Sequence, residues 1–192
     1  IPHAAAALSA AKHQGGATHC FFDVSMLGGR RDEMELLRDL RLAIERRELE
    51  LFYQPKIHAP SGEITGVEAL MRWNHAQRGT VSPEVFIPIA ERYGLIHAIG
   101  NWLIDESCRQ IRVWRDGGLR MGVAISLSVH QLRQSDLAAR IGAALQHNRL
   151  EARVLTCEIT ETVATDDSHD AHGVIDELAA LGVHLSIDDF GT

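Results

Sequence analysis

Acidic residues at the ends of predicted strands could bind a divalent metal ion. Four of them lie within, or directly after, apolar runs typical of strands: Glu68, Glu158, Asp188 and Asp189. In a parallel α/β barrel, the carboxyl ends of the strands form the rim that binds ligands. Carboxylates gathered there repel one another unless a hard cation neutralises them. Any one of them alone is better explained as a strand-end residue facing water. The whole set predicts an Mg²⁺ or Mn²⁺ site, in which adjacent aspartates could serve two metals.

The elements that must position these residues alternate between strand and helix. Strands are predicted over 49–57, 64–73, 122–127, 154–159 and 183–187, and helices from 32 and over 83–92, 99–115, 134–146 and 169–181. The turn residues Pro60-Ser61-Gly62 predict that the first two strands form a hairpin. Strands that alternate with helices of ten or more residues indicate βαβ units and a parallel sheet.

Net charge, cysteine spacing and the length of the apolar runs disfavour several classes of protein. The chain has 192 residues and a formal charge of −7, which disfavours a protein that binds polymeric nucleic acid. Its three cysteines are far apart, which favours buried thiols in a reducing compartment. No apolar run reaches the roughly 18 residues of a membrane span. We therefore expect a cytoplasmic protein, or the cytoplasmic portion of a larger sensor protein.

Five blocks of sequence resemble one known family, the EAL domain, whose members are cyclic di-GMP phosphodiesterases of bacterial signalling. The blocks are Tyr53-Gln54-Pro55, Gly66-Val67-Glu68-Ala69-Leu70-Met71-Arg72-Trp73, Pro83-x-x-Phe86-Ile87, Glu158-x-Thr160-Glu161 and Asp188-Asp189-Phe190-Gly191-Thr192. They occur in the order and spacing of that family, so residues 32–192 are expected to form an EAL domain. Residues 1–25 resemble the end of a GGDEF (diguanylate cyclase) domain, and 26–31 would be the linker.

The resemblance implies a fold and a reaction. The fold would be an α/β barrel of the modified TIM type with one antiparallel strand. The reaction would be the hydrolysis of cyclic di-GMP to linear pGpG with Mg²⁺ or Mn²⁺, and members often form homodimers. Residues matching the metal ligands of the family are Glu68, Ser126, Glu158, Asp188 and Asp189, and those matching its substrate contacts are Gln54, Leu70 and Arg72. Glu161 matches a glutamate that anchors the loop after Asp189, and Glu68, Asp189 and Glu161 would be catalytic.

The physical chemistry of Arg72 agrees with this assignment. An arginine four residues after Glu68 in a strand points to the same face, because side chains in a strand alternate with a period of two. Its planar guanidinium can bind two oxygens of a phosphate.

Two departures from the family pattern leave an alternative open. Ser126 stands where the family usually has an asparagine, and a serine hydroxyl is a shorter and weaker ligand. The chain stops after Thr192, before the last strands and a lysine of the family. We therefore expect a barrel that is incomplete at its C-terminus and no activity from these residues alone. The alternative function is a non-catalytic regulatory module that binds cyclic di-GMP.

Overall fold

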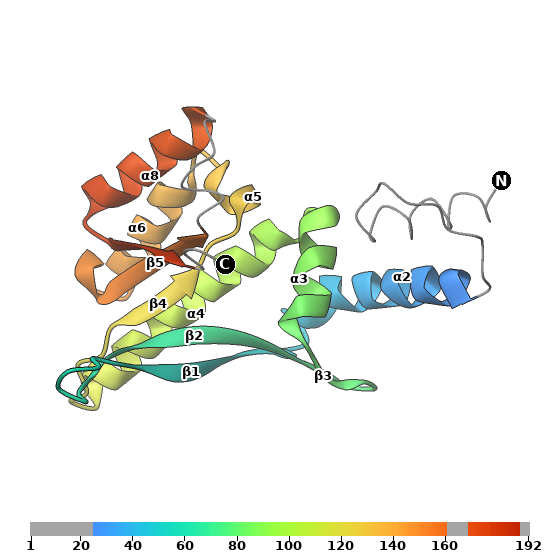
Figure 1. The fold of residues 1–192 in the computed structure, drawn as a ribbon, viewed down its shortest axis with the longest axis horizontal. Helices are drawn as coiled ribbons and strands as arrows, with labels where there is room; N and C mark the ends of the chain where they lie inside the picture. The colour runs from blue at the N-terminus through green and yellow to red at the C-terminus, as the bar shows by residue number, and fades with distance from the viewer. Residues whose placement is uncertain (1–24, 161–168, 189–192) are drawn as a thin grey trace.

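A mixed sheet organises the chain. The computed structural model describes residues 25–160 and 169–188, and in this part six strands form one sheet in the order β1-β2-β4-β5-β6, with β3 beside β2 (Figure 1). The strands are β1 (Leu49–Ile57), β2 (Ile64–His75), β3 (Gly79–Val81), β4 (Val123–Ser126), β5 (Leu155–Thr160) and β6 (His184–Asp188). The α/β class is confirmed.

The strand directions follow the sequence pattern. β1 and β2 form an antiparallel hairpin, whereas β2, β4, β5 and β6 run parallel to one another. The prediction of a single antiparallel strand was wrong, because the short β3 also pairs antiparallel with the end of β2. β3 has only three residues and begins at Gly79, whose φ is +69°, so the sequence shows no strand pattern there.

One helix precedes the sheet, and the others lie between its strands. The helices are α2 (Ser25–Ala43), α3 (Pro83–Arg92), α4 (Ile96–Asp116), α5 (Val129–Leu132), α6 (Leu137–His147), α8 (His169–Leu181) and the short 3₁₀ helix η1 (Ala152–Val154). The bounds of α3 agree with the prediction, because Ser82 caps it by accepting a hydrogen bond from the Glu84 amide at 3.3 Å, and Pro83 occupies the first turn. No sequence pattern predicted α5, which is one turn closed by a capping box between Ser128 and Gln131.

The predicted linker at 26–31 belongs to a helix. Residues 25–31 are the first turns of α2, which extends from the sheet alongside α3 (Figure 1). Gly28 and Gly29 suggested a break, but isolated glycines lower helix stability by only about 1 kcal/mol each. Later in the helix, Leu36, Leu37 and Leu40 are buried and fix it to the rest of the domain. Residues 1–24, which include the expected GGDEF remnant, lie outside the described residues.

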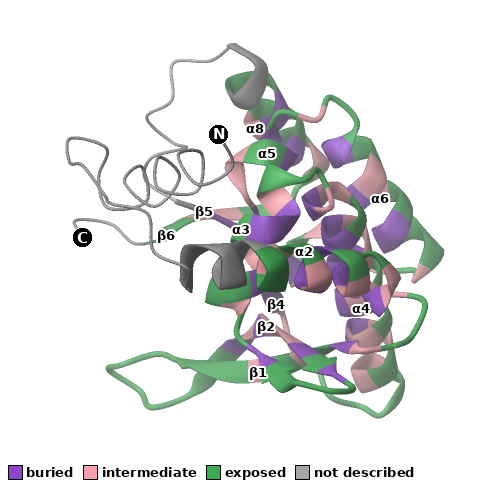
Figure 2. Cartoon of the chain, turned by 90° about the vertical axis from the view of Figure 1, so that its right-hand side faces the viewer, coloured by how far each residue is buried: buried purple, intermediate pink, exposed green. Residues whose placement is uncertain are grey.

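Buried side chains form two clusters in the described part of the chain. The larger packs one face of the sheet against α4, α6 and α8, through residues such as Ile125, Ile141 and Leu178. The smaller joins α2 and α3 to the end of β2 around Trp73 and Phe86. Figure 2 shows the buried positions concentrated where helices meet the sheet, while β1 is mostly exposed.

Two sequence expectations concern cysteine and membrane spans. Cys108 and Cys157 are free and buried, as predicted, whereas Cys20 lies outside the described residues. Within the residues that the structure describes, no helix is long and apolar enough to cross a membrane.

Candidate active site

The face of the sheet opposite the helices carries the predicted site residues. Side chains alternate along each strand, so Val67, Ala69 and Cys157 pack under the helices while their neighbours point to the other side. The candidates on that other side are Gln54, Glu68, Leu70, Arg72, Ser126, Glu158 and Asp188. Asp189 and Glu161 lie outside the described residues.

The candidates form a diagonal row across the strands. Two of the three steps are offset by two residues: Glu68 pairs with Ala124, two residues before Ser126, and Asp188 pairs with Thr160, two residues after Glu158. Ser126 and Glu158 pair directly. Strands of a barrel are tilted, so side chains at one height on neighbouring strands are offset in register. The offset therefore brings residues from β2, β4, β5 and β6 toward the same rim, while Gln54 lies directly opposite Glu68 on β1.

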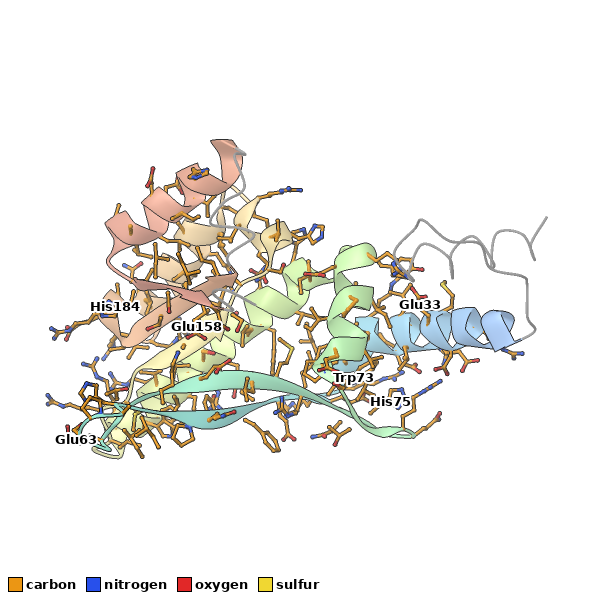
Figure 3. All side chains as sticks on the ribbon, viewed as in Figure 1. Glu33, Glu63, Trp73, His75, Glu158 and His184 are labelled. Atoms are coloured by element: carbon orange, nitrogen blue, oxygen red, sulfur yellow. The ribbon has the colours of Figure 1, made fainter. Side chains whose placement is uncertain are left out.

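Glu158 is the most deeply buried of the described carboxylates, with 4% of its surface exposed. Its Oε1 accepts a hydrogen bond from Nζ of Lys56, forming an ion pair between β5 and β1 (Figure 3 labels Glu158). A buried charge of this kind needs a partner, because removal from water costs several kcal/mol. Lys56 was not among the residues predicted for the site. The available signal was its position two residues after Gln54, on the same face of β1.

The acidic residues influence one another electrostatically. The pKa of Glu68 is raised, mainly because burial disfavours its charged form. The negative charges of Glu158 and Asp188 raise the pKa of Glu68 further, and the ammonium of Lys56 opposes them. The three carboxylates are therefore close enough to repel, and Lys56 offsets only part of that repulsion.

Arg72 is positioned above the same face before any ligand binds. Its Nη1 donates a hydrogen bond to the carbonyl oxygen of Met71 at 2.9 Å. Its guanidinium carbon lies 5.5 Å from the ring centre of Phe52, a cation–π contact between β2 and β1. Arg72 is half-buried, which favours strong pairing with an anion.

A cavity of about 310 Å³ opens at the carboxyl ends of β2 and β4. Leu70, Arg72 and Ser126 line it from the sheet, and Ile87 and Gly100 line it from α3 and α4. A Cβ at position 100 would lie 2.0 Å from Nε2 of Gln131, so any larger residue there would displace that side chain. The cavity thus joins two predicted substrate contacts to the predicted ligand Ser126.

The chemistry of the donors fits a hard cation. Carboxylate and hydroxyl oxygens are the ligands preferred by Mg²⁺ and Mn²⁺. In residues 25–160 and 169–188, however, no three acidic, histidine or cysteine side chains converge closely enough to hold one ion.

Comparison with known proteins identifies relatives. The family model described as EAL domain matches residues 37–192. The bifunctional diguanylate cyclase/cyclic di-GMP phosphodiesterase MucR of Pseudomonas aeruginosa is 46% identical over 191 residues, which are 99% of this chain and 28% of that protein. The chain therefore spans little more than a quarter of this curated relative.

Solved structures share the fold. The PaMucR phosphodiesterase in its c-di-GMP complex superimposes with a TM-score of 0.78 and 47% identity, over 82% of this chain and 64% of that one. The EAL enzyme Bd1971, in a form bound to cAMP and cyclic di-GMP, has a TM-score of 0.77 and 30% identity, over 94% and 48% of the two chains. Both relatives bind cyclic di-GMP in those structures.

Proposed function

The chain belongs to the EAL domain family, and we propose that it forms part of a metal-dependent phosphodiesterase that hydrolyses cyclic di-GMP to linear pGpG. The relatives support the substrate, since MucR is named a cyclic di-GMP phosphodiesterase and its structure is a c-di-GMP complex. The observation that carries the proposal is the row of mutually repelling carboxylates beside a pre-positioned arginine.

Arg72 binds the substrate phosphate in this proposal. Its guanidinium faces the same side of the sheet as Glu68, so it can donate two hydrogen bonds to phosphate oxygens and offset their charge. Leu70 contacts the substrate from the wall of the 310 Å³ cavity, and Gln54 contacts it from β1. Because Arg72 is already held by Met71 and Phe52, little side-chain entropy is lost when the substrate binds.

The carboxylate row would hold Mg²⁺ or Mn²⁺. The proposed ligands are Glu68, Ser126, Glu158, Asp188 and Asp189, with Glu161 anchoring the loop that follows Asp189. When bound, such an ion neutralises phosphate charge and lowers the pKa of coordinated water, the nucleophile of hydrolysis. Burial of Glu158 and its pairing with Lys56 restrict the movement of that carboxylate.

A second candidate function is supported by particular observations at the same rim. Ser126 offers one neutral hydroxyl, and the ammonium of Lys56 already occupies one oxygen of Glu158. A rim neutralised partly by its own lysine, with a weaker ligand at position 126, would suit a regulatory module that binds cyclic di-GMP without cutting it.

Binding and hydrolysis measured together distinguish the two functions. We would use the longest natural form of the protein that contains these residues, titrate cyclic di-GMP by calorimetry, and follow pGpG by chromatography. Release of pGpG that requires Mg²⁺ or Mn²⁺ and stops with EDTA supports the phosphodiesterase. Binding without release in either metal supports the regulatory module, and the absence of both contradicts each proposal.

A further inference from the structure

A second, larger cavity lies at the opposite ends of the parallel strands. Its volume is about 470 Å³, within the range of small-molecule sites. It is lined by the first residues of β2, β4, β5 and β6, whereas the candidate active site lies at their last residues. Figure 3 shows His184, which lines this cavity, at the end of the molecule remote from Trp73 and His75.

The ionisable side chains that line this cavity are all basic among the described residues. They come from five separate segments: Lys56, Arg115, Arg120, Arg153 and His184. This is unusual in a chain whose formal charge is −7. Cations that converge from separate segments create a positive field, because each of them repels the others until an anion arrives.

Nearby carboxylates neutralise only part of this charge. Glu151 pairs with Arg153 at 2.6 Å and with Arg115 at 3.5 Å, and Glu158 pairs with Lys56. In the part of the chain that the structure describes, Arg120 has no hydrogen-bonding or ion-pair partner. Three of the four lysine and arginine side chains thus share two carboxylates, and Arg120 has donors available for a ligand.

We propose that this cavity binds a small anion carrying several phosphate charges, of the class of nucleoside polyphosphates. Arginine forks match pairs of phosphate oxygens, and three arginines at one opening can engage successive phosphates. The volume accommodates a nucleoside in addition to the phosphates. Lys56 also pairs with Glu158, but Arg72 does not line this cavity, which lies at the opposite ends of the strands. A ligand here is therefore distinct from the substrate of the proposed reaction.

The test uses charge-matched variants. The double variant Arg120→Gln/Arg153→Gln removes two cations from the cavity. The control Arg41→Gln/Arg112→Gln removes two cations that do not line it, from an exposed position on α2 and a half-buried position on α4. Lys56 stays unaltered because it also pairs with Glu158. The single variant Arg120→Gln retains the test if the double variant folds poorly, which thermal melting would reveal.

The probes are GTP and inorganic tripolyphosphate, titrated by calorimetry at low and physiological salt. We expect the wild-type protein to bind at least one of these probes. The double cavity variant should weaken that binding at least tenfold and Arg120→Gln at least threefold, whereas the control pair should weaken it less than twofold. Tighter binding of GTP assigns a nucleoside polyphosphate, and equal binding assigns a polyphosphate chain. No binding by wild type at millimolar probe, or equal losses in the cavity and control variants, would overturn the proposal.

Discussion

Removing the charge of Lys56 should destabilise the domain, because the Glu158 carboxyl group, with only 4% of its surface exposed, would lose its ion-pair partner. Deleting one partner of a fully buried ion pair costs about 3–5 kcal/mol. The Lys56 side chain is 43% exposed, so water can reach the pair and replace part of the lost interaction. We therefore expect Lys56→Met to lower the free energy of unfolding by about 2 kcal/mol. In a domain of this size the melting temperature would fall by roughly 4–8 °C.

A double-mutant cycle isolates this ion pair. Urea unfolding would be measured in EDTA for wild type, Lys56→Met, Glu158→Gln and the double variant, because bound metal would mask the lost cation. In the Glu158→Gln background there is no charge to leave unpaired, so Lys56→Met should cost less than about 0.5 kcal/mol. Arg120→Met, which removes a cation unpartnered within the described residues, is the control. An equal cost of Lys56→Met in both backgrounds would refute the reasoning.

Three further predictions concern other residues. Arg72→Ala should weaken cyclic di-GMP binding about 30-fold or more in calorimetry, since a charged hydrogen bond contributes about 2–3 kcal/mol. Arg72→Lys should recover only part of the lost affinity, and unchanged affinity in Arg72→Ala would remove Arg72 from the site. Ser126→Asn should lower the metal concentration for half-maximal pGpG release about tenfold, which corresponds to about 1.4 kcal/mol. An unchanged or higher metal concentration for half-maximal release would exclude Ser126 as a ligand. A hydrogen bond from Arg38, with a further one from His75, lowers the pKa of Asp39 in the folded protein. The ionised carboxylate therefore stabilises the fold above the unfolded pKa near 3.8, and this contribution is lost as the pH falls through the folded pKa. Asp39→Asn should therefore show a smaller loss of urea stability than wild type between about pH 5 and pH 3, and identical losses would contradict this.

The sequence predicted elements well where local chemistry defines their ends. Ser82 and Pro83 determine where α3 begins. The predicted end of α8 at Leu181 also agrees with the structure, and Gly182, at a φ of +89°, follows it. The same approach failed where packing decides the outcome. Gly28 and Gly29 look like a break, yet the burial of leucines later in α2 favours a continuous helix.

The candidate site was predictable only in part. Strand alternation was enough to place Glu68 and Arg72 on one face, because both lie in β2. The pairing of Lys56 with Glu158 joins residues of two strands that are not neighbours in the sheet, so no local pattern reports it. The roles of Asp189 and Glu161 stay predictions.

The central claim is that the carboxylate row serves metal-dependent hydrolysis, and Glu68→Gln tests it most directly. The change preserves shape and removes one anionic ligand beside Glu158 and Asp188. In the longest natural form of the protein, pGpG release measured across an Mn²⁺ titration should fall at least about 100-fold in this variant. Cyclic di-GMP affinity, which we propose rests on Arg72, should change only a few-fold. Wild-type pGpG release by Glu68→Gln at every metal concentration would contradict the claim.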